Sequence, residues 1–86
     1  MIKTAVVILN WNGRKFLEKF LPGVIDSTVS DDTEIIVADN GSDDDSVSWL
    51  SDSHPGLKVI RLERNWGYAG GYNRALKEVE AEYYIL

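Results

Sequence analysis

"TAVVILNWNG", residues 4–13, decides the fold that the sequence predicts, because a run of aliphatic and β-branched residues stops abruptly at a turn. An unbroken apolar run such as 4–9 is typical of a strand that is covered on both faces, as the strands of parallel sheets are. The following "NWNG" is rich in residues that favour turns. We therefore expect a buried parallel strand that ends directly in a loop.

Three further segments of the chain have the character of strands. "EIIVAD" at 34–39 predicts a second buried strand. "LKVIRL" at 57–62 alternates and predicts a third strand near a sheet edge, where Lys58 and Arg61 tolerate water. "YYIL" at 83–86 begins a fourth strand.

Helices are expected in the intervals between these strands, since apolar residues recur there at helical spacing. The first helix begins at Arg14, and Pro22–Gly23 is expected to break or kink it; a break would make the stretch to Ser27 a separate turn. Ser42 or Asp43 is expected to cap the second helix. The third extends from about 70 to 81.

The alternation of strands and helices predicts an α/β fold of the Rossmann-like type. Such an order requires right-handed crossovers, a mostly parallel sheet and helices on both of its faces, which makes three layers, α/β/α. Short connections place the first three strands side by side, and the fourth returns beside the first, giving the order 3-2-1-4. Ligands of open α/β sheets bind where this order reverses.

Length, charge and composition exclude several classes of protein. Eighty-six residues form one small domain, and a net charge of −5 without a cluster of Lys and Arg argues against a nucleic-acid partner. There is no cysteine, hence no disulfide and no cysteine-ligated metal. The longest apolar stretch is far short of the ~20 residues that span a bilayer, and no secretory signal is evident at the N-terminus. These features favour a cytoplasmic location.

The polar chemistry collects at one edge of the predicted sheet, because "NWN", "DNGS" and "NWGYAGG" each follow the carboxyl end of a parallel strand. These segments supply an indole that can pack on a base and a carboxylate that can pair with its N–H groups. They also supply glycines whose bare backbone can face a phosphate. The set is typical of a nucleotide site. It comprises Trp11, Asp39, the amides of Asn10, Asn12, Asn40 and Asn65, and the glycines Gly67, Gly70 and Gly71.

The chain resembles the family 2 glycosyltransferases, which have the GT-A fold. Three motifs in order support the resemblance: a strand that enters "NWN" at 10–12, a strand that ends in "DNGSD" at 39–43, and "NWGYAGGYN" at 65–73. Two positions depart from the usual pattern, since Leu9 replaces a common Pro and Tyr72 a common Arg. The versions of the first and third motifs are most similar to bacterial rhamnosyltransferases.

The resemblance implies a role for each motif. Trp11 would lie near the base with Asn10 beside it, Asp39 would accept hydrogen bonds from the base, and the third motif would line the diphosphate and the sugar. The donor would be a UDP or dTDP sugar, transferred with inversion to a glycan acceptor in cell-surface polysaccharide synthesis. The implied nucleotide-sugar site consists of Asn10, Trp11, Asn12, Asp39, Asn40, Gly41, Ser42, Asn65, Gly67, Gly70, Gly71 and Asn73.

The resemblance also implies that parts of such an enzyme lie beyond residue 86. The fourth strand leads, in this family, to an acidic motif that holds Mg²⁺ or Mn²⁺, and the catalytic base follows later. We therefore expect residues 1–86 to be the N-terminal nucleotide-binding part, without catalytic or metal-binding residues and inactive by itself. A full-length protein would lie in the cytoplasm or at the inner face of the membrane. The free edge of the fourth strand is expected to favour homo-oligomers.

Other interpretations remain open at this stage. A dinucleotide-binding oxidoreductase is disfavoured because "NWNGRK" at 10–15 replaces G-x-G-x-x-G. A flavodoxin-like signalling domain would need an acidic pair after the first strand and a phosphoacceptor Asp after the third, where this chain has "NWN" and "ERNWG". A non-enzymatic interaction module is the remaining alternative. Trp11 could cap the core, Asp39 could form a turn, and the glycines could serve turns alone. The remaining candidates are expected to have no part in binding. Asp43, Asp44 and Asp45 are expected to be helix-cap or solvated charges, and His54 a surface residue. Trp49, Trp66 and Tyr68 are expected to be packing groups, and Leu76 and Val79 to lie in the core.

Overall fold

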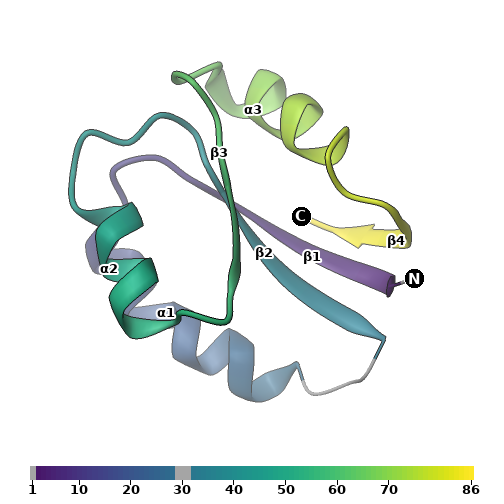
Figure 1. Ribbon diagram of the computed structural model, residues 1–86. Coiled ribbons are helices and arrows are strands. Elements are labelled where there is room, and N and C mark those ends of the chain that lie inside the picture. Colours follow the sequence, from purple (N-terminus) through teal and green to yellow (C-terminus); the bar gives the residue numbers. More distant parts are fainter. Residues whose placement is uncertain (1, 29–31) are drawn as a thin grey trace.

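The computed structural model describes residues 2–28 and 32–86 and contains one four-stranded sheet (Figure 1). All of its pairings are parallel, in the order β3-β2-β1-β4, as predicted. Along the chain the elements are β1 (Ile2–Asn10), α1 (Arg14–Ser27), β2 (Thr33–Asp39), α2 (Ser46–Ser53), β3 (Lys58–Arg61), α3 (Gly67–Leu76) and β4 (Ala81–Ile85). No helix of the described part is long and apolar enough to cross a membrane.

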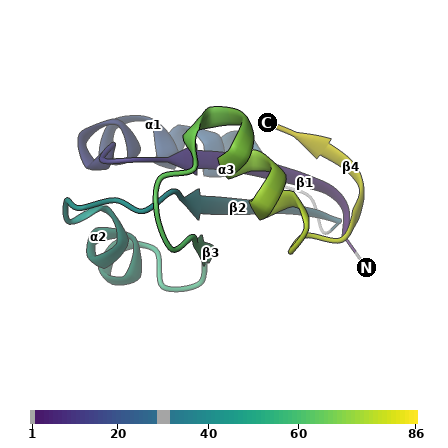
Figure 2. The same cartoon turned by 90° about the horizontal axis from the view of Figure 1, so that it is seen from above.

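The helices cover both faces of the sheet, which confirms the three-layer arrangement (Figure 2). On one face, α3 packs over β1 and β2, and Val7, Ile36 and Ala75 are fully buried there. On the other face, Leu21 of α1 and Leu50 of α2 are buried against β2. Alternate side chains of each strand point to opposite faces, so the continuous apolar runs serve two cores at once.

The strand register brings the carboxyl ends of three strands to one level. Asn10 of β1 pairs with Asp39 of β2, and Asp39 pairs with Arg61 of β3. The loops that follow these residues therefore leave the sheet side by side. β4 is shorter at this end, because Ile85 pairs with Val6.

The predicted break of the first helix at Pro22–Gly23 is wrong, because α1 continues through Pro22 to Ser27. Proline removes one helical hydrogen bond, normally at a cost of about 3 kcal/mol. Pro22 is exposed, as is Glu18 four residues earlier, so water can reach the carbonyl that loses its partner. Leu21 remains fully buried on the opposite side, and this packing holds the helix together across the proline.

The boundaries of the second and third helices also differ from the prediction. The second helix has Asp45 at its N-cap rather than Ser42 or Asp43, and the Ser46 amide donates to Asp44 Oδ1 at 3.0 Å. The third helix occupies 67–76 rather than 70–81, so its glycines lie in its first turns.

The core prediction for the end of this helix is confirmed for Val79, which is buried just beyond α3. Leu76 is half-buried and packs against the same core. β4 begins at Ala81, two residues before the expected start of the fourth strand.

Candidate functional site

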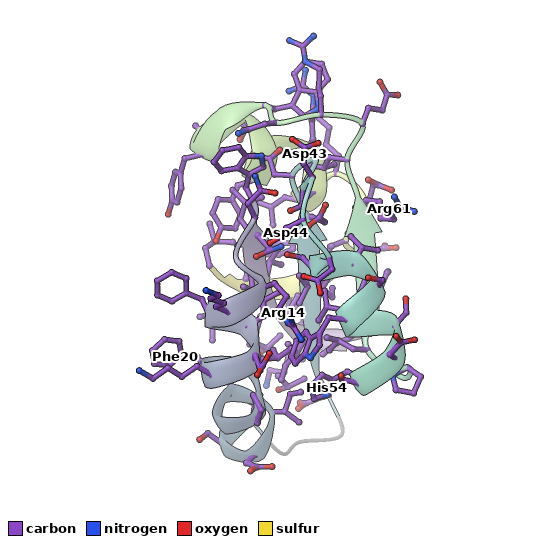
Figure 3. The ribbon with its side chains drawn as sticks, turned by 90° about the vertical axis from the view of Figure 1, so that its left-hand side faces the viewer. Arg14, Phe20, Asp43, Asp44, His54 and Arg61 are labelled. Atoms are coloured by element: carbon purple, nitrogen blue, oxygen red, sulfur yellow. The ribbon has the colours of Figure 1, made fainter. Side chains whose placement is uncertain are left out.

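The candidate site is the rim formed by the loops after β1, β2 and β3, which we call the strand-end rim (residues 10–14, 39–45 and 61–67). Figure 3 shows Asp43 and Asp44 on this side of the molecule, with Arg14 lying between α1 and α2 below them. Of the predicted site residues, the rim brings together those of the first two motifs with Asn65 and Gly67. Gly70, Gly71 and Asn73 lie farther along α3.

A buried carboxylate occupies the centre of the rim. Asp39 is 3% exposed, and its Oδ1 accepts hydrogen bonds from Asn10 Nδ2 at 2.9 Å and from Ser42 Oγ at 2.7 Å. The backbone N–H of Ser42 donates to the other oxygen, Oδ2, at 3.0 Å. Burial of a carboxylate is costly unless donors surround it, and these three donors meet that requirement.

Asn12 joins the first loop to the second. Its backbone N–H donates to Ser42 Oγ at 2.8 Å, and its side-chain Oδ1 accepts from the backbone N–H groups of Asp43 (2.7 Å) and Asp44 (3.1 Å). The residue has φ 50°, a left-handed conformation that asparagine tolerates better than most residues. Asn12 therefore holds the two loops in a fixed relative position.

The acidic triplet at 43–45 serves the start of α1. Arg14 donates from its backbone N–H to Asp44 Oδ2 at 3.2 Å, and its guanidinium bridges to Asp45 at 3.2 Å and to Glu18 at 3.0 Å. Burial acts to raise the pKa of Asp44, but hydrogen bonds from Ser46 and Arg14 outweigh it and hold that pKa below its ordinary value. This agrees with a structural role for the triplet.

Asn40 connects the second loop to the third. It is 2% exposed, and its Nδ2 donates both to Asn65 Oδ1 at 3.1 Å and to the carbonyl of Gly67 at 3.0 Å. Its Oδ1 accepts from the backbone N–H of Trp66 at 3.1 Å. Both amide hydrogens are thus used within the protein, so this side chain positions the mouth of α3 from beneath.

The glycines of the rim differ in what surrounds them. A Cβ on Gly41, which has φ 78°, would lie 2.5 Å from the backbone carbon of Arg64, so this glycine lets two loops touch. A Cβ on Gly71 would lie 2.8 Å from Asn40 Nδ2, so here the protein itself fills the space. Gly67 has no atom within 4 Å of that position and borders open space at the start of α3.

Aromatic side chains on the rim lie in two environments. Trp11 is 53% exposed and makes no hydrogen bond among the described residues. Trp66 lies between two guanidinium groups, with the Cζ atoms of Arg64 and Arg74 at 4.3 Å and 3.5 Å from its ring centroid. Trp11 therefore offers a free aromatic surface, and Trp66 does not.

Two tyrosines of α3 have roles that the sequence did not predict. The hydroxyl of Tyr72 accepts from the backbone N–H of Leu9 at 3.3 Å, and so takes up a donor at the edge of β1. The only signal in the sequence was the replacement of the usual Arg by a tyrosine. Tyr68 is 74% exposed, so the expected packing role is wrong apart from its edge contact with Tyr72.

The expected packing role of Trp49 is confirmed, whereas His54, which was expected to lie at the surface, is half-buried. Trp49 packs, half-buried, against the core beneath α1 and α2. His54 caps the end of α2 and meets the Trp49 ring edge-on, with 5.5 Å between the ring centroids.

Comparison with known proteins identifies the family. Residues 5–86 match glycosyl transferase family 2. An uncharacterized glycosyltransferase YfnE of Bacillus subtilis (strain 168) is 31% identical over 87 residues, which include 99% of this chain but only 22% of that protein.

A solved structure has the same fold. Mannosyltransferase PcManGT from Pyrobaculum calidifontis, in complex with GDP-Man and Mn²⁺, superposes with a TM-score of 0.74 over 91% of this chain and 24% of its own, at 23% identity. The chain thus spans about a quarter of the length of these relatives. With its motifs and its sheet order in agreement, the chain belongs to glycosyl transferase family 2.

Proposed function

We propose that this chain forms the donor-binding part of an enzyme that transfers sugar from a UDP or dTDP sugar to an acceptor hydroxyl, with inversion. A role in cell-surface glycan synthesis and a cytoplasmic location, at the inner face of the membrane, belong to the same proposal. The observation that supports it best is the presence of a buried carboxylate, Asp39, and an exposed indole, Trp11, at the adjacent carboxyl ends of β2 and β1, beside the β1–β4 boundary where the strand order reverses. The GDP-Man bound to the structural neighbour supports a nucleotide sugar as donor.

Each part of the rim has a function in this proposal. The face of Trp11 stacks against the base, and Asp39 accepts a hydrogen bond from a base N–H. The open space at Gly67 leaves room for the diphosphate beside the N-terminus of α3, where the helix dipole favours negative charge. Asn12 and Asn40 keep the three loops at the distances that a nucleotide requires.

The residues described do not fit the divalent metal that the neighbour contains. Residues 2–28 and 32–86 include no group of three or more His, Cys, Asp or Glu side chains that could hold a metal ion. Asp44 and Asp45 are already engaged with the start of α1. We therefore expect this chain to bind a nucleotide and not to transfer sugar by itself.

Titration of the chain with UDP, followed by amide chemical shifts, tests the proposal. Shifts are expected at Trp11, Asp39 and Gly67, and NAD and FMN should leave these amides unchanged. Trp11→Ala is expected to weaken UDP binding by about 5-fold or more, since stacking of one base on an aromatic side chain contributes about 1–3 kcal/mol.

Phe20→Ala is the matched control, because Phe20 is also 53% exposed but lies on α1. It should leave the affinity unchanged. Shifts at Gly70 and Gly71 with NAD alone would instead favour a dinucleotide-binding oxidoreductase. Absence of any response to nucleoside diphosphates would refute the proposal.

A further inference from the structure

The hydrogen bonds already made by Asp39 limit what a ligand can add to it. A carboxylate offers about four lone-pair directions, two on each oxygen. Asn10 Nδ2 and Ser42 Oγ occupy both directions on Oδ1, and the Ser42 N–H occupies one on Oδ2. Among the described residues no donor takes the second direction on Oδ2, and we assign this direction to a ligand.

The two donors that saturate Oδ1 are held in place by their own surroundings. Asn10 is 5% exposed, and its amide must turn Nδ2 toward Asp39, because a carboxylate only accepts. The Ser42 hydroxyl also accepts from the backbone N–H of Asn12 at 2.8 Å, so its proton is directed to Asp39. Asn10 Nδ2 also donates to Ser42 Oγ at 3.3 Å, so the two donors to Oδ1 are linked to each other as well as to the carboxylate.

Nucleobases differ in the donors that they present to a carboxylate. Uracil and thymine present one imide N–H between two carbonyl groups, and so need a single acceptor. Guanine presents two parallel donors, N1–H and the exocyclic amine, which pair best with both oxygens of a carboxylate. Cytosine and adenine present a ring nitrogen lone pair at the corresponding position, which a carboxylate repels.

We propose that Asn10 and Ser42 determine base specificity: by saturating Oδ1 of Asp39 they leave one acceptor, which suits uracil or thymine and disfavours guanine. This inference rests on the proposed function, since it assumes that Asp39 contacts the base. Under this proposal, Asn10 and Ser42 select the base through the carboxylate of Asp39 and need not touch the nucleotide themselves.

The first experiment compares UDP, dTDP, CDP and GDP as ligands of the unmodified chain by amide-shift titration. The diphosphate is common to all four, so differences in affinity report on the base. UDP and dTDP are expected to bind alike, and GDP and CDP at least about tenfold more weakly, since a site rejects a base whose polar groups it leaves unpaired. Equal or tighter binding of GDP would overturn the inference while leaving the proposed function intact. Failure of all four to bind would overturn the proposed function itself.

A second experiment tests whether Ser42 contributes to the selection of uracil over guanine. Ser42→Ala removes one of the two donors to Oδ1, and the ratio of UDP to GDP affinity is expected to fall. Ser42→Thr keeps the hydroxyl and should restore the wild-type ratio. Ser48→Ala removes an exposed hydroxyl of α2 that, among the described residues, donates to the Asp45 carbonyl alone, and should not change the ratio. An unchanged ratio in folded Ser42→Ala would show that Ser42 does not select the base.

Discussion

The strand-end rim and the β4 edge belong to one sheet, yet the rim buries polar side chains and the β4 edge exposes apolar ones. At the rim, Asp39 and Asn40 are nearly inaccessible to solvent, and every polar group that they bury has a partner. At the β4 edge, Tyr83 and Ile85 of the strand and Leu86 just after it are each more than half exposed, at 60%, 56% and 59%. Polar groups are thus buried at the rim because they have hydrogen-bond partners, whereas apolar side chains at the β4 edge are exposed to solvent.

The comparison also separates two kinds of surface. A preorganised polar rim suits a small ligand, because its groups need not rearrange on binding. An apolar strand with free backbone groups suits another polypeptide, which can extend the sheet. Three substitutions test this difference. The first is at a glycine of the rim, the second on β4, and the third in the acidic triplet of the rim.

The largest effect is expected from Gly41→Ala. A Cβ at this position would lie 2.5 Å and 2.6 Å from backbone atoms of Arg64, and φ is 78°. Strain at positive φ and overpacking each cost about 1–3 kcal/mol, so the free energy of unfolding should fall by about 2–5 kcal/mol. Urea unfolding followed by tryptophan fluorescence measures this change.

The matched control for that substitution is Gly23→Ala on α1, where no atom lies within 4 Å of the new Cβ. This change should raise stability by up to about 1 kcal/mol, since alanine favours helix more than glycine does. Wild-type stability in Gly41→Ala would contradict the close approach of the two loops at the rim.

An intermediate effect is expected at the β4 edge. The free edge should pair with a second copy of the chain, so sedimentation at increasing concentration is expected to show dimers or larger species. Ile85→Lys should weaken this association about tenfold or more, because it places a charge on the pairing strand. Phe16→Lys, at a residue of α1 that is 71% exposed, should not do so. Strictly monomeric wild-type protein at high concentration would count against the proposal.

The smallest effect concerns Asp44. Because the folded state holds the pKa of Asp44 below its ordinary value, the carboxylate stabilises the fold above the unfolded pKa of about 3.9. That contribution is lost as the pH falls through the lower folded pKa. Asp44→Asn should therefore lower Tm slightly at neutral pH, and its Tm should fall less than that of the wild type as the pH is lowered from 5 to about 2.5.

Asp52→Asn is the control for this pH series, since Asp52 lies on α2 and its side chain forms no hydrogen bond or ion pair with the described residues. Its Tm should follow the wild-type profile. Identical acid profiles for Asp44→Asn and the wild type would show that the bonds from Ser46 and Arg14 add no stability.

Much of the fold could be predicted from local patterns. The apolar runs at 4–9 and 34–39 lie within β1 and β2, and the order of the sheet followed from the alternation of strands and helices. These features depend on a few adjacent residues and on the handedness of crossovers. The error at Pro22 has a non-local origin, since the burial of Leu21 against the sheet outweighs the local preference of proline.

The candidate site, like the fold, could be predicted only in part. Its residue types and their place at strand ends were evident in the sequence, because parallel strands bring their carboxyl ends to one edge. Which of them are free for a ligand was not evident. Asn40 and Gly71 proved to be used within the protein, whereas Trp11 and Gly67 face open space.

By itself, then, the sequence determined the parallel sheet, its order and the edge at which polar groups gather, since each follows from short-range patterns. Only the tertiary structure decided how those groups are paired. Asp39 meets Asn10 across 29 residues of chain, and Asn40 meets Asn65 across 25. Such bonds depend on the relative placement of separate strands and loops, which no local pattern specifies.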